Sequence, residues 1–312
     1  MFNIQKMKVI LIGPITKDTI FIGNLKKRTM IGGSVYYASE TFKKMGWEVE
    51  IIPTIAEKDK ILLSQISQGI KISPVYKSKT IEFKNIYSKK NYFERIQKTE
   101  EYSQKLEKKD IKNIIFEDSN LIFLGPQNTL DLTKETIEYI YNKNKNICLY
   151  SQGLFRKVKG DLVVFDEWKN KKEYLKKTKY LIINTNELKS LLKDKTEKEL
   201  WEELKDFGVN ELILGKGEKG FTIYTKETNK IDVYYPSKED IVNPNGATST
   251  FSAGYLSQRL KDKSIIDSAE IAITATFLKL KRWEKSKKNI SELQRIINLK
   301  NNIIPELESS KF

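Results

Sequence analysis

Four segments of the chain carry glycines or polar side chains, at spacings that could bind an anion or a flat ligand. The first is residues 31–34 (IGGS), where Gly32 and Gly33 directly precede a helical pattern. Paired glycines let the backbone approach a ligand closely, and the first turn of a helix leaves N–H donors unpaired. A plain tight turn would use the same residues. Taken alone, this segment is therefore either a ligand loop or a turn.

Two further segments follow predicted buried strands. Residues 184–187 (NTNE) close one strand and begin a helix, so Asn184 and Glu187 could order a ligand; an acidic residue in the first helical turn is equally explained by capping. Residues 215–220 (GKGEKG) lie between two strands. This loop could enclose a flat or charged group, or it could be an ordinary glycine-containing hairpin.

The fourth segment, residues 243–251 (NPNGATSTF), opens a long helix of small and apolar residues. The backbone N–H groups from Gly246 to Ser249 would point at the mouth of the loop. Together with the hydroxyls of Ser249 and Thr250 they would form an anion site at a helix N-terminus.

The composition excludes several kinds of catalysis. The chain of 312 residues has no histidine, which rules out Ser-His-Asp and Cys-His catalysis and every zinc site that uses histidine. Chemistry must come from carboxylates, lysine, arginine, hydroxyls, backbone amides or a bound Mg²⁺. The single cysteine, Cys148, lies in an apolar run and predicts a buried thiol in a reducing compartment, so we expect a cytoplasmic protein.

The net charge of +15, from 56 basic and 41 acidic residues, has two interpretations. It could mark an anionic partner, or it could reflect lysines scattered over a solvated surface. The densest basic clusters, residues 26–28 and 279–288, lack the interleaved aromatic residues of a base-stacking surface. We therefore expect no dedicated nucleic-acid site. No apolar run approaches the roughly 20 residues needed to cross a bilayer, so we expect no membrane partner either.

Strand-like and helix-like segments alternate along most of the chain, which predicts a parallel sheet covered by helices on both faces. The strand-like segments are residues 7–13, 47–52, 121–125, 147–151, 180–184 and 211–215, and the helix-like segments include residues 34–45, 130–142 and 197–207.

Other segments break this rhythm. Residues 19–22 and 80–97 alternate between polar and apolar side chains and have no helix between them, which predicts half-exposed antiparallel strands in a flap. Residues 221–225 and 231–235 predict a second hairpin. We expect one domain over residues 1–312, with a small β lid from about residues 14–31 and 76–98.

The order of these segments resembles the PfkB/ribokinase-like carbohydrate kinase family over nearly the whole chain. That family has a Gly-Gly before a helix, an Asn-x-x-Glu, a glycine loop on the nucleotide side, and the motif Asp-Thr-x-Gly-Ala-Gly-Asp-x-Phe-x-x-Gly. The matching residues, in order, are Gly32 and Gly33, Asn184 and Glu187, Gly217 and Gly220, and then Gly246, Ala247, Phe251, Ala253 and Gly254. Residues 152–156 and 166–168 further suggest a branch similar to inositol-type PfkB kinases.

The resemblance implies an α/β, ribokinase-like Rossmann-type sandwich with a mainly parallel central sheet, helices on both faces and a small β lid. It implies ATP-dependent phosphorylation of a hydroxyl on a sugar, a polyol or a nucleoside, with Mg²⁺, and a possible homodimer through the lid. The residues implied to bind substrate are Asp18, Gly32, Gly33, Gln152 and Arg156. Those implied to bind the nucleotide are Asn184, Glu187, Gly215, Gly217, Gly220 and Asn243. Glu187 is also implied to order Mg²⁺ indirectly, without binding it directly. The implied anion hole is formed by Gly246, Ala247, Thr248 and Ser249.

The sequence departs from this pattern at the residue that should be the general base. The family's catalytic Asp falls on Ser249, its preceding Gly on Thr248, and its opening Asp-Thr on Asn243 and Pro244. A serine hydroxyl does not accept a proton near neutral pH, and loss of general-base catalysis typically costs about 10²–10⁴-fold in rate. Asp240 could compensate, although its place before the turn points it elsewhere.

Three hypotheses follow. The protein is a sugar or polyol kinase homologue, active or weakly active, or a pseudokinase that keeps the ligand cleft and has a regulatory or scaffolding role, or a basic protein associated with nucleic acid. The changes at Thr248 and Ser249 favour the second over a fully competent enzyme, and only the charge supports the third.

Overall fold

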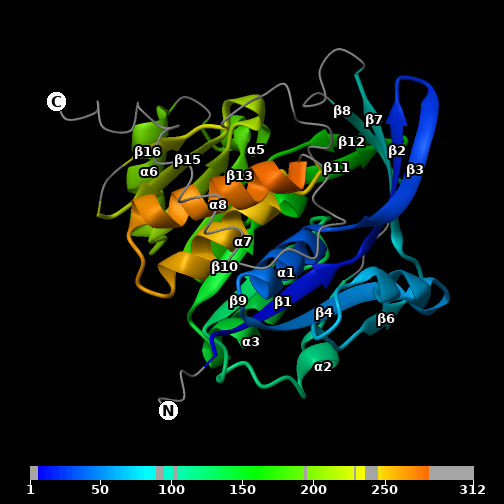
Figure 1. Cartoon of the computed structure of the whole chain (residues 1–312), viewed down its shortest axis with the longest axis horizontal. Helices are drawn as coiled ribbons and strands as arrows, with labels where there is room; N and C mark the ends of the chain where they lie inside the picture. Colours follow the sequence, from blue (N-terminus) through cyan, green and yellow to red (C-terminus); the bar gives the residue numbers. More distant parts are fainter. Residues whose placement is uncertain are drawn as a thin grey trace.

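The computed structural model describes residues 6–88, 95–100, 105–192, 195–227, 230–235 and 245–280, and its strands form two sheets. The larger sheet has the order β16-β15-β14-β13-β10-β9-β1-β4-β5, with β6 also paired to β4 (Figure 1). Its strands are β1 (Lys8–Pro14), β4 (Glu48–Ala56), β5 (Lys71–Ile72), β6 (Val75–Lys77), β9 (Leu121–Leu124), β10 (Ile147–Tyr150), β13 (Tyr180–Asn184), β14 (Glu211–Gly215), β15 (Phe221–Thr225) and β16 (Ile231–Val233).

Most pairs in the larger sheet are parallel, as the alternation of strands and helices predicted. Buried parallel strands are apolar on both faces, and β9, β10 and β14 are buried throughout. The antiparallel pairs are at one end of the sheet, where β15 returns beside β14 and β16 beside β15. The hairpin predicted from residues 221–235 is therefore confirmed.

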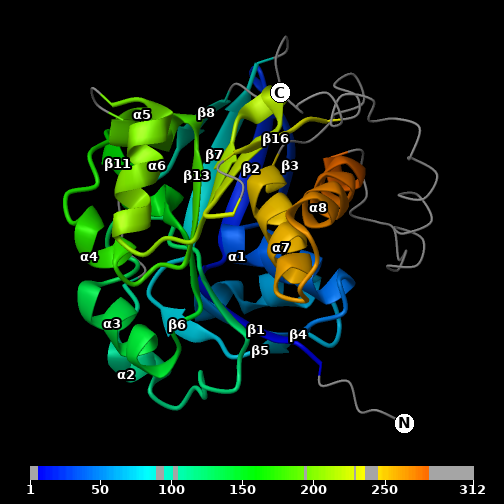
Figure 2. The ribbon, with the colours of Figure 1, turned by 90° about the vertical axis from the view of Figure 1, so that its left-hand side faces the viewer.

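Helices cover both faces of this sheet (Figure 2). One face carries α1 (Ser34–Lys44), α7 (Ala247–Arg259) and α8 (Ile265–Leu280). The other carries α2 (Lys108–Ile111), α3 (Lys134–Lys143), α4 (Lys171–Leu175), α5 (Thr185–Leu192) and α6 (Glu197–Asp206). Short 3₁₀ segments η1 (Glu57–Gln65), η2 (Ser151–Phe155) and η3 (Gly217–Lys219) connect the elements. Within the described residues, no helix combines the length and the apolar character needed to span a bilayer.

Helix α7 is buried from Ser249 to Gln258, because it lies between the sheet, α1 and α8. Its small side chains allow this close packing. A Cβ atom added to Gly254 would lie only 3.1 Å from the Cα atom of Ala272 in α8. The run of small residues in the sequence thus has a packing function, and it fixes the position of the first turn of α7.

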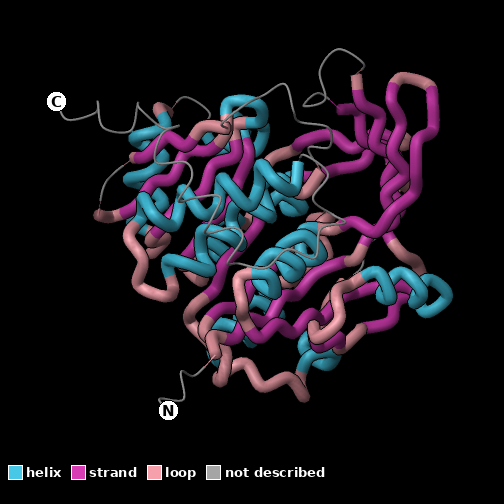
Figure 3. Tube along the Cα trace, viewed as in Figure 1, coloured by secondary structure: helices cyan, strands magenta, loops and turns pink. Residues whose placement is uncertain are grey.

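The smaller sheet projects from the larger one and has the order β11-β12-β8-β7-β2-β3 (Figure 3). Its strands are β2 (Thr16–Ile22), β3 (Leu25–Gly32), β7 (Ile81–Tyr87), β8 (Arg95–Lys98), β11 (Arg156–Lys159) and β12 (Leu162–Phe165). The hairpin of β11 and β12 was not foreseen as part of this sheet.

One prediction about this sheet was wrong. Residues 19–22 and 80–97 were expected to be antiparallel, but β2 and β7 pair in parallel. The reason lies in the larger sheet, where β1 and β6 both run parallel to β4. Since β2 follows β1 and β7 follows β6, both strands leave the larger sheet in the same direction. The antiparallel partners are β3 for β2 and β8 for β7.

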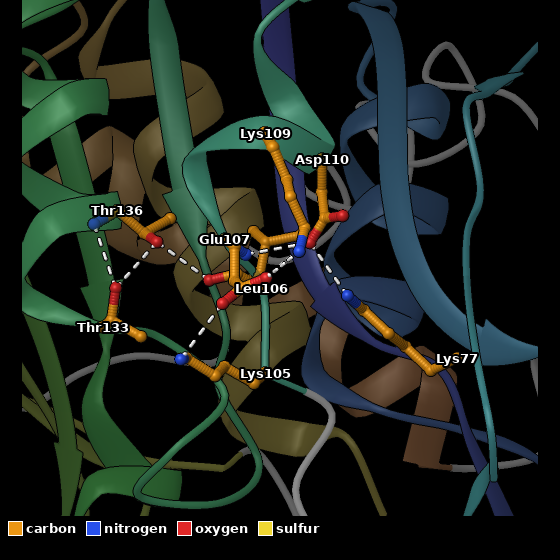
Figure 4. Close-up of polar contacts among 8 residues, drawn as sticks. All are labelled: Lys77, Lys105, Leu106, Glu107, Lys109, Asp110, Thr133 and Thr136. Carbon is orange, nitrogen blue, oxygen red and sulfur yellow. Dashed lines mark hydrogen bonds and ion pairs between the residues drawn. The ribbon is translucent and has the colours of Figure 1, made fainter.

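Local capping explains where the helices far from the cleft begin. Helix α3 starts at Lys134, four residues later than predicted, because the Thr133 hydroxyl accepts a hydrogen bond from the Thr136 N–H at 3.1 Å. Figure 4 shows how α2 is held beside it: Glu107 and Asp110 form a capping box, and the Thr136 hydroxyl donates to the Leu106 carbonyl at 2.8 Å. These contacts stabilise the face of the sheet opposite α7.

Candidate active site

A cleft of about 190 Å³ lies between the smaller sheet, the first turn of α7 and the carboxyl ends of the central strands. Strands β10, β13 and β14 are neighbours in the sheet, and each contributes its last residue to the lining: Tyr150, Asn184 and Gly215. Ligands of open α/β sheets bind beyond these ends. The other lining residues are Thr16, Asp18, Gly33, Ser34, Tyr37, Phe83, Tyr87, Arg95, Gln97, Gln127, Gln152, Arg156, Gly217, Phe221, Tyr235, Asn245, Gly246, Ala247, Thr248 and Ser249.

The structure brings most of the predicted site residues to this one cleft. Those that line it are Asp18, Gly33, Gln152, Arg156, Asn184, Gly215, Gly217, Gly246, Ala247, Thr248 and Ser249. Gly32, Glu187 and Gly220 are not among the residues that line it. Asn243 falls outside the described residues, as do Pro244 and Asp240.

The first turn of α7 is shaped by Gly246, which has a left-handed backbone with φ of +73°. Glycine adopts this conformation without strain, and a Cβ atom here would lie 2.3 Å from the Tyr37 ring. The helix's first internal bond runs from the Thr250 N–H to the Gly246 carbonyl, at 2.9 Å. The N–H groups of residues 247–249 precede this bond, so they are free of helical partners and can bind an anion.

Thr248 and Ser249 occupy the positions where the resemblance implied glycine and aspartate. The Thr248 side chain packs against Gly215, where a Cβ atom would approach the Thr248 Oγ1 to 2.9 Å. Ser249 is buried, with 2% of its surface exposed. Among the residues that line the cleft, Asp18 is the only one with a carboxyl group. The described site therefore has no acid at the predicted base position.

Asp18 projects from β2, and its carboxylate accepts a hydrogen bond from the Thr16 hydroxyl at 2.7 Å. Burial raises the pKa of Asp18, while Thr16 and the guanidinium of Arg95 act in the opposite direction. The paired glycines make room for this arrangement. A Cβ atom on Gly32 would lie 2.5 Å from the Asp18 Cγ, and one on Gly33, whose φ is +103°, would lie 2.5 Å from the Pro14 carbonyl oxygen.

Glu187 is fully buried at the start of α5, where it holds Asn184 in place. Its Oε2 accepts from the Asn184 N–H at 2.7 Å, and its Oε1 accepts from the Asn184 Nδ2 at 2.5 Å. Burial raises the pKa of Glu187 to about 7, in spite of these hydrogen bonds. Its contacts make it a positioning residue for Asn184, which lines the cleft.

A metal ion bound directly by side chains does not fit this site. Within the described ranges no three acidic, histidine or cysteine residues come together as a metal site would require. Both carboxylate oxygens of Glu187 already accept hydrogen bonds from Asn184. The indirect role for Glu187 toward Mg²⁺ stays a prediction.

Several lining residues were missed by sequence reasoning, among them Gln127, Tyr87 and Arg95. The Gln127 Oε1 accepts from Nη1 of the predicted Arg156 at 2.9 Å, and the Gln127 Nε2 donates to the Ser34 hydroxyl at 3.0 Å. The Arg95 Nη1 donates to the Asn245 Oδ1 at 3.1 Å, and the Tyr87 hydroxyl donates to the same oxygen.

One signal could have found part of this set. Phe83 and Tyr87 are four residues apart in a segment already predicted as a strand, and every second residue of a strand faces the same side. Gln127 and Tyr150 carry no comparable signal in the sequence.

The arrangement of sheets, helices and cleft defines a ribokinase-like α/β protein. The chain is similar in structure to a pyrophosphate-dependent kinase in the ribokinase family, solved as a sulfate complex, with a TM-score of 0.77 and 18% identity over 87% of this chain and 95% of that one. It is similar to Arabidopsis thaliana ribokinase, solved with ribose and ATP, with a TM-score of 0.71 and 15% identity over 94% and 99% of the two chains. It is also similar to Burkholderia thailandensis nucleoside kinase, solved with inosine, with a TM-score of 0.72 and 16% identity over 93% and 98%.

Residues 155–282 match the family described as pfkB family carbohydrate kinase. This segment contains β13, α5, β14, α7 and α8, of which β13, β14 and α7 contribute lining residues to the cleft. No curated protein matches the chain in sequence. The predicted fold class is confirmed, and so is the resemblance to PfkB and ribokinase-like carbohydrate kinases.

We predict that Gly246→Ala destabilises the protein more than Gly160→Ala does. Both glycines have positive φ, +73° and +63°, so both substitutions strain the backbone by about 1–2 kcal/mol. Only at position 246 does the new Cβ meet the Tyr37 ring; nothing lies within 4 Å at position 160. Overpacking should add about 1–3 kcal/mol, measured as the free energy of unfolding in urea. Equal losses in the two variants would show that α7 does not depend on this contact.

We also predict that Glu187 makes the protein less stable as pH rises. The pKa of Glu187 is raised from an ordinary 4.5 to about 7 in the folded protein, so between these values the folded form binds more protons than the unfolded form. Its contribution to stability is thus fully present below the ordinary pKa and is lost as pH rises through the folded one.

The measurement is the free energy of unfolding from about pH 5 to about pH 8, for the wild type and for Glu187→Gln. The variant should show a shallower decline. Glu199→Gln is the control, because the pKa of this exposed helix-cap carboxyl is lowered by hydrogen bonds from Thr196 and its titration lies below that range. A slope unchanged by Glu187→Gln would mean that the raised pKa is wrong.

Proposed function

We propose that the protein is a phosphotransferase that moves a phosphoryl group to a hydroxyl of a sugar, a polyol or a nucleoside, at a low rate. The observation that carries the proposal is the first turn of α7, which opens into a cleft whose opposite wall bears the Asp18 carboxylate. The first feature suits a phosphate and the second suits a hydroxyl. The structural similarity to kinases solved with ribose, inosine and ATP supports this choice of class.

In this proposal the N–H groups of residues 247–249 hold the phosphoryl group that is transferred. Asp18 holds the acceptor by a hydroxyl, and the smaller sheet limits access of water to the cleft. Phosphoryl transfer depends chiefly on positioning and on stabilisation of charge, so a reaction can proceed with part of the usual set of groups. The chain retains the positioning groups.

The chain has Ser249 where the resemblance implies an aspartate, so in this proposal no carboxylate at that position takes the proton from the attacking hydroxyl. A positioned base is typically worth about 10²–10⁴-fold in rate, which is the size of the deficit we expect. Asp18 does not replace it in this proposal, because it is assigned to hold the acceptor.

Two phosphoryl donors are candidates. ATP is the donor that the sequence resemblance implies, and it was bound in the similar Arabidopsis ribokinase. Pyrophosphate is used by the similar kinase solved as a sulfate complex, and another structure of the kind contains a pyrophosphate analogue and myo-inositol. Both donors present phosphate oxygens to the α7 amides, so both belong in any assay.

The second candidate function is that of a pseudokinase, which binds ligands and regulates or scaffolds without turnover. The observation that favours it is Thr248, whose side chain packs on Gly215. This side chain fills space at the anion site that glycine would leave open.

The test is to restore the missing groups. We predict that Ser249→Asp raises phosphoryl transfer by on the order of 10²-fold, and that adding Thr248→Gly raises it further, because the loop can then approach the phosphate. Rates are measured with ATP and with pyrophosphate against a panel of sugars, polyols and nucleosides. Asp18→Ala in the restored background is the control and should abolish the gain.

Two results would contradict the proposal. Wild-type turnover at an ordinary kinase rate would mean that another group serves as the base. Binding of donor and acceptor by the double variant, with no gain in turnover, would favour the pseudokinase.

A further inference from the structure

Two guanidinium groups enter the cleft from the smaller sheet. Arg156, at the start of β11, is buried with only 6% of its surface exposed. Its Nη1 donates to the Gln127 Oε1, and its guanidinium lies 5.3 Å from the centre of the Phe83 ring. The Arg156 Nε has no hydrogen-bond partner among the described residues. A buried donor without a partner is costly, and this one belongs to a residue that lines the cleft.

Arg95 reaches the same cleft from β8. Arg95 is an exposed residue, and its guanidinium group is nevertheless held by a hydrogen bond from its Nη1 to the Asn245 Oδ1. The same oxygen accepts a hydrogen bond from the Tyr87 hydroxyl. Asn245 directly precedes Gly246, so this guanidinium lies where the smaller sheet meets the first turn of α7. Within the described part of the chain, neither Arg95 nor Arg156 forms an ion pair with an acidic side chain.

Two acids act electrostatically on these arginines, but neither is in direct contact with a guanidinium group. Asp18 is the only carboxyl-bearing residue among the described residues that line the cleft, and Glu187 is buried and does not line it; burial raises the pKa of both. Burial and the charge of Arg95 lower the pKa of Arg156 to about 10. The buried Arg156 therefore has no ion-pair partner among the described residues, which is costly for a buried charge.

We propose that the acceptor carries an oxyanion, a carboxylate or a phosphate, which binds between the guanidinium groups of Arg95 and Arg156 while Asp18 holds a hydroxyl. An arginine fork pairs with a planar or tetrahedral oxyanion through two hydrogen bonds, so the free Nε of Arg156 gains the partner it lacks. This inference rests on the proposed function, which places the acceptor on this side of the cleft.

The alternative is that the two arginines bind the phosphates of the donor. The contacts of Arg156 argue against it, because its guanidinium lies over the ring of Phe83, the β7 residue paired with Asp18 of β2. The donor already has the amides of residues 247–249. An oxyanion on the acceptor accounts for the Arg156 guanidinium, whose contacts are with Phe83 and Gln127.

The experiment measures binding to the whole protein by calorimetry, without any donor. Two matched pairs are compared: gluconate with sorbitol, and ribose 5-phosphate with ribose. In at least one pair the anionic member should bind about tenfold more tightly or better, because charged hydrogen bonds form with both arginines. A preference in the first pair indicates a sugar acid, and one in the second pair indicates a sugar phosphate.

Arg156→Met and Arg95→Met should each reduce the preference for the anionic member to near unity. Lys157→Met is the matched control, because this neighbouring β11 residue is exposed and paired with Asp166, so the preference should persist. The wild-type comparison alone decides the question if a variant fails to fold.

Four outcomes would overturn the proposal. The first two are equal binding of both members in each pair, and no binding of any member at millimolar concentration. The third is a preference for the anionic member that persists in both arginine variants. The fourth is that the arginine variants lose affinity only for ATP or pyrophosphate. Its failure is distinguishable from that of the proposed function. Turnover of a neutral acceptor without any preference contradicts this inference alone, whereas an anion preference without turnover contradicts the function alone.

Discussion

The cleft depends on one constraint, the fixed direction of the first turn of α7. Gly246 turns the chain through a left-handed conformation against the Tyr37 ring, and the helix then runs between the sheet and α8. Phe251, one turn into the helix, is stacked on Phe221 of β15 with ring centres 3.8 Å apart. Packing thus holds the chain at Gly246 and at Phe251. The N–H groups of residues 247–249, which lie between these two residues, therefore have a fixed direction. Rigid, preoriented donors of this kind bind an anion without a cost of reorganisation.

The wall opposite α7 comes from strands far away in the chain, and this is why the sequence revealed it only in part. The order of strands and helices and the anion turn could be inferred from local patterns, and Asp18 only from the family resemblance. The pairing of β2 with β7 could not, since it follows from the shared direction of β1 and β6 in the larger sheet. Arg95 reaches the cleft only because β8 pairs with β7, and no local pattern specifies that register. The paired glycines were read as a loop or a turn, whereas Gly32 makes room for the Asp18 carboxylate.

The two walls differ in what they retain. On the α7 side the anion site is intact in its backbone, but Ser249 provides no base and Thr248 fills space against Gly215. On the side of the smaller sheet, Asp18, Arg95 and Arg156 form a polar and positively charged surface. Arg156 is buried and has no ion-pair partner among the described residues, and a buried charge lowers stability unless it is paired. This supports the proposal that the cleft binds an anionic ligand.

The central claim is that the first turn of α7 binds the phosphate of a donor. A crystal structure of the protein soaked with pyrophosphate tests it most directly, since this ligand carries no base or sugar that could bind elsewhere. The account predicts density for a phosphate group within hydrogen-bond distance, about 2.7–3.2 Å, of the N–H groups of residues 247–249. Pyrophosphate bound only at surface lysines, with the α7 amides facing solvent, would contradict it.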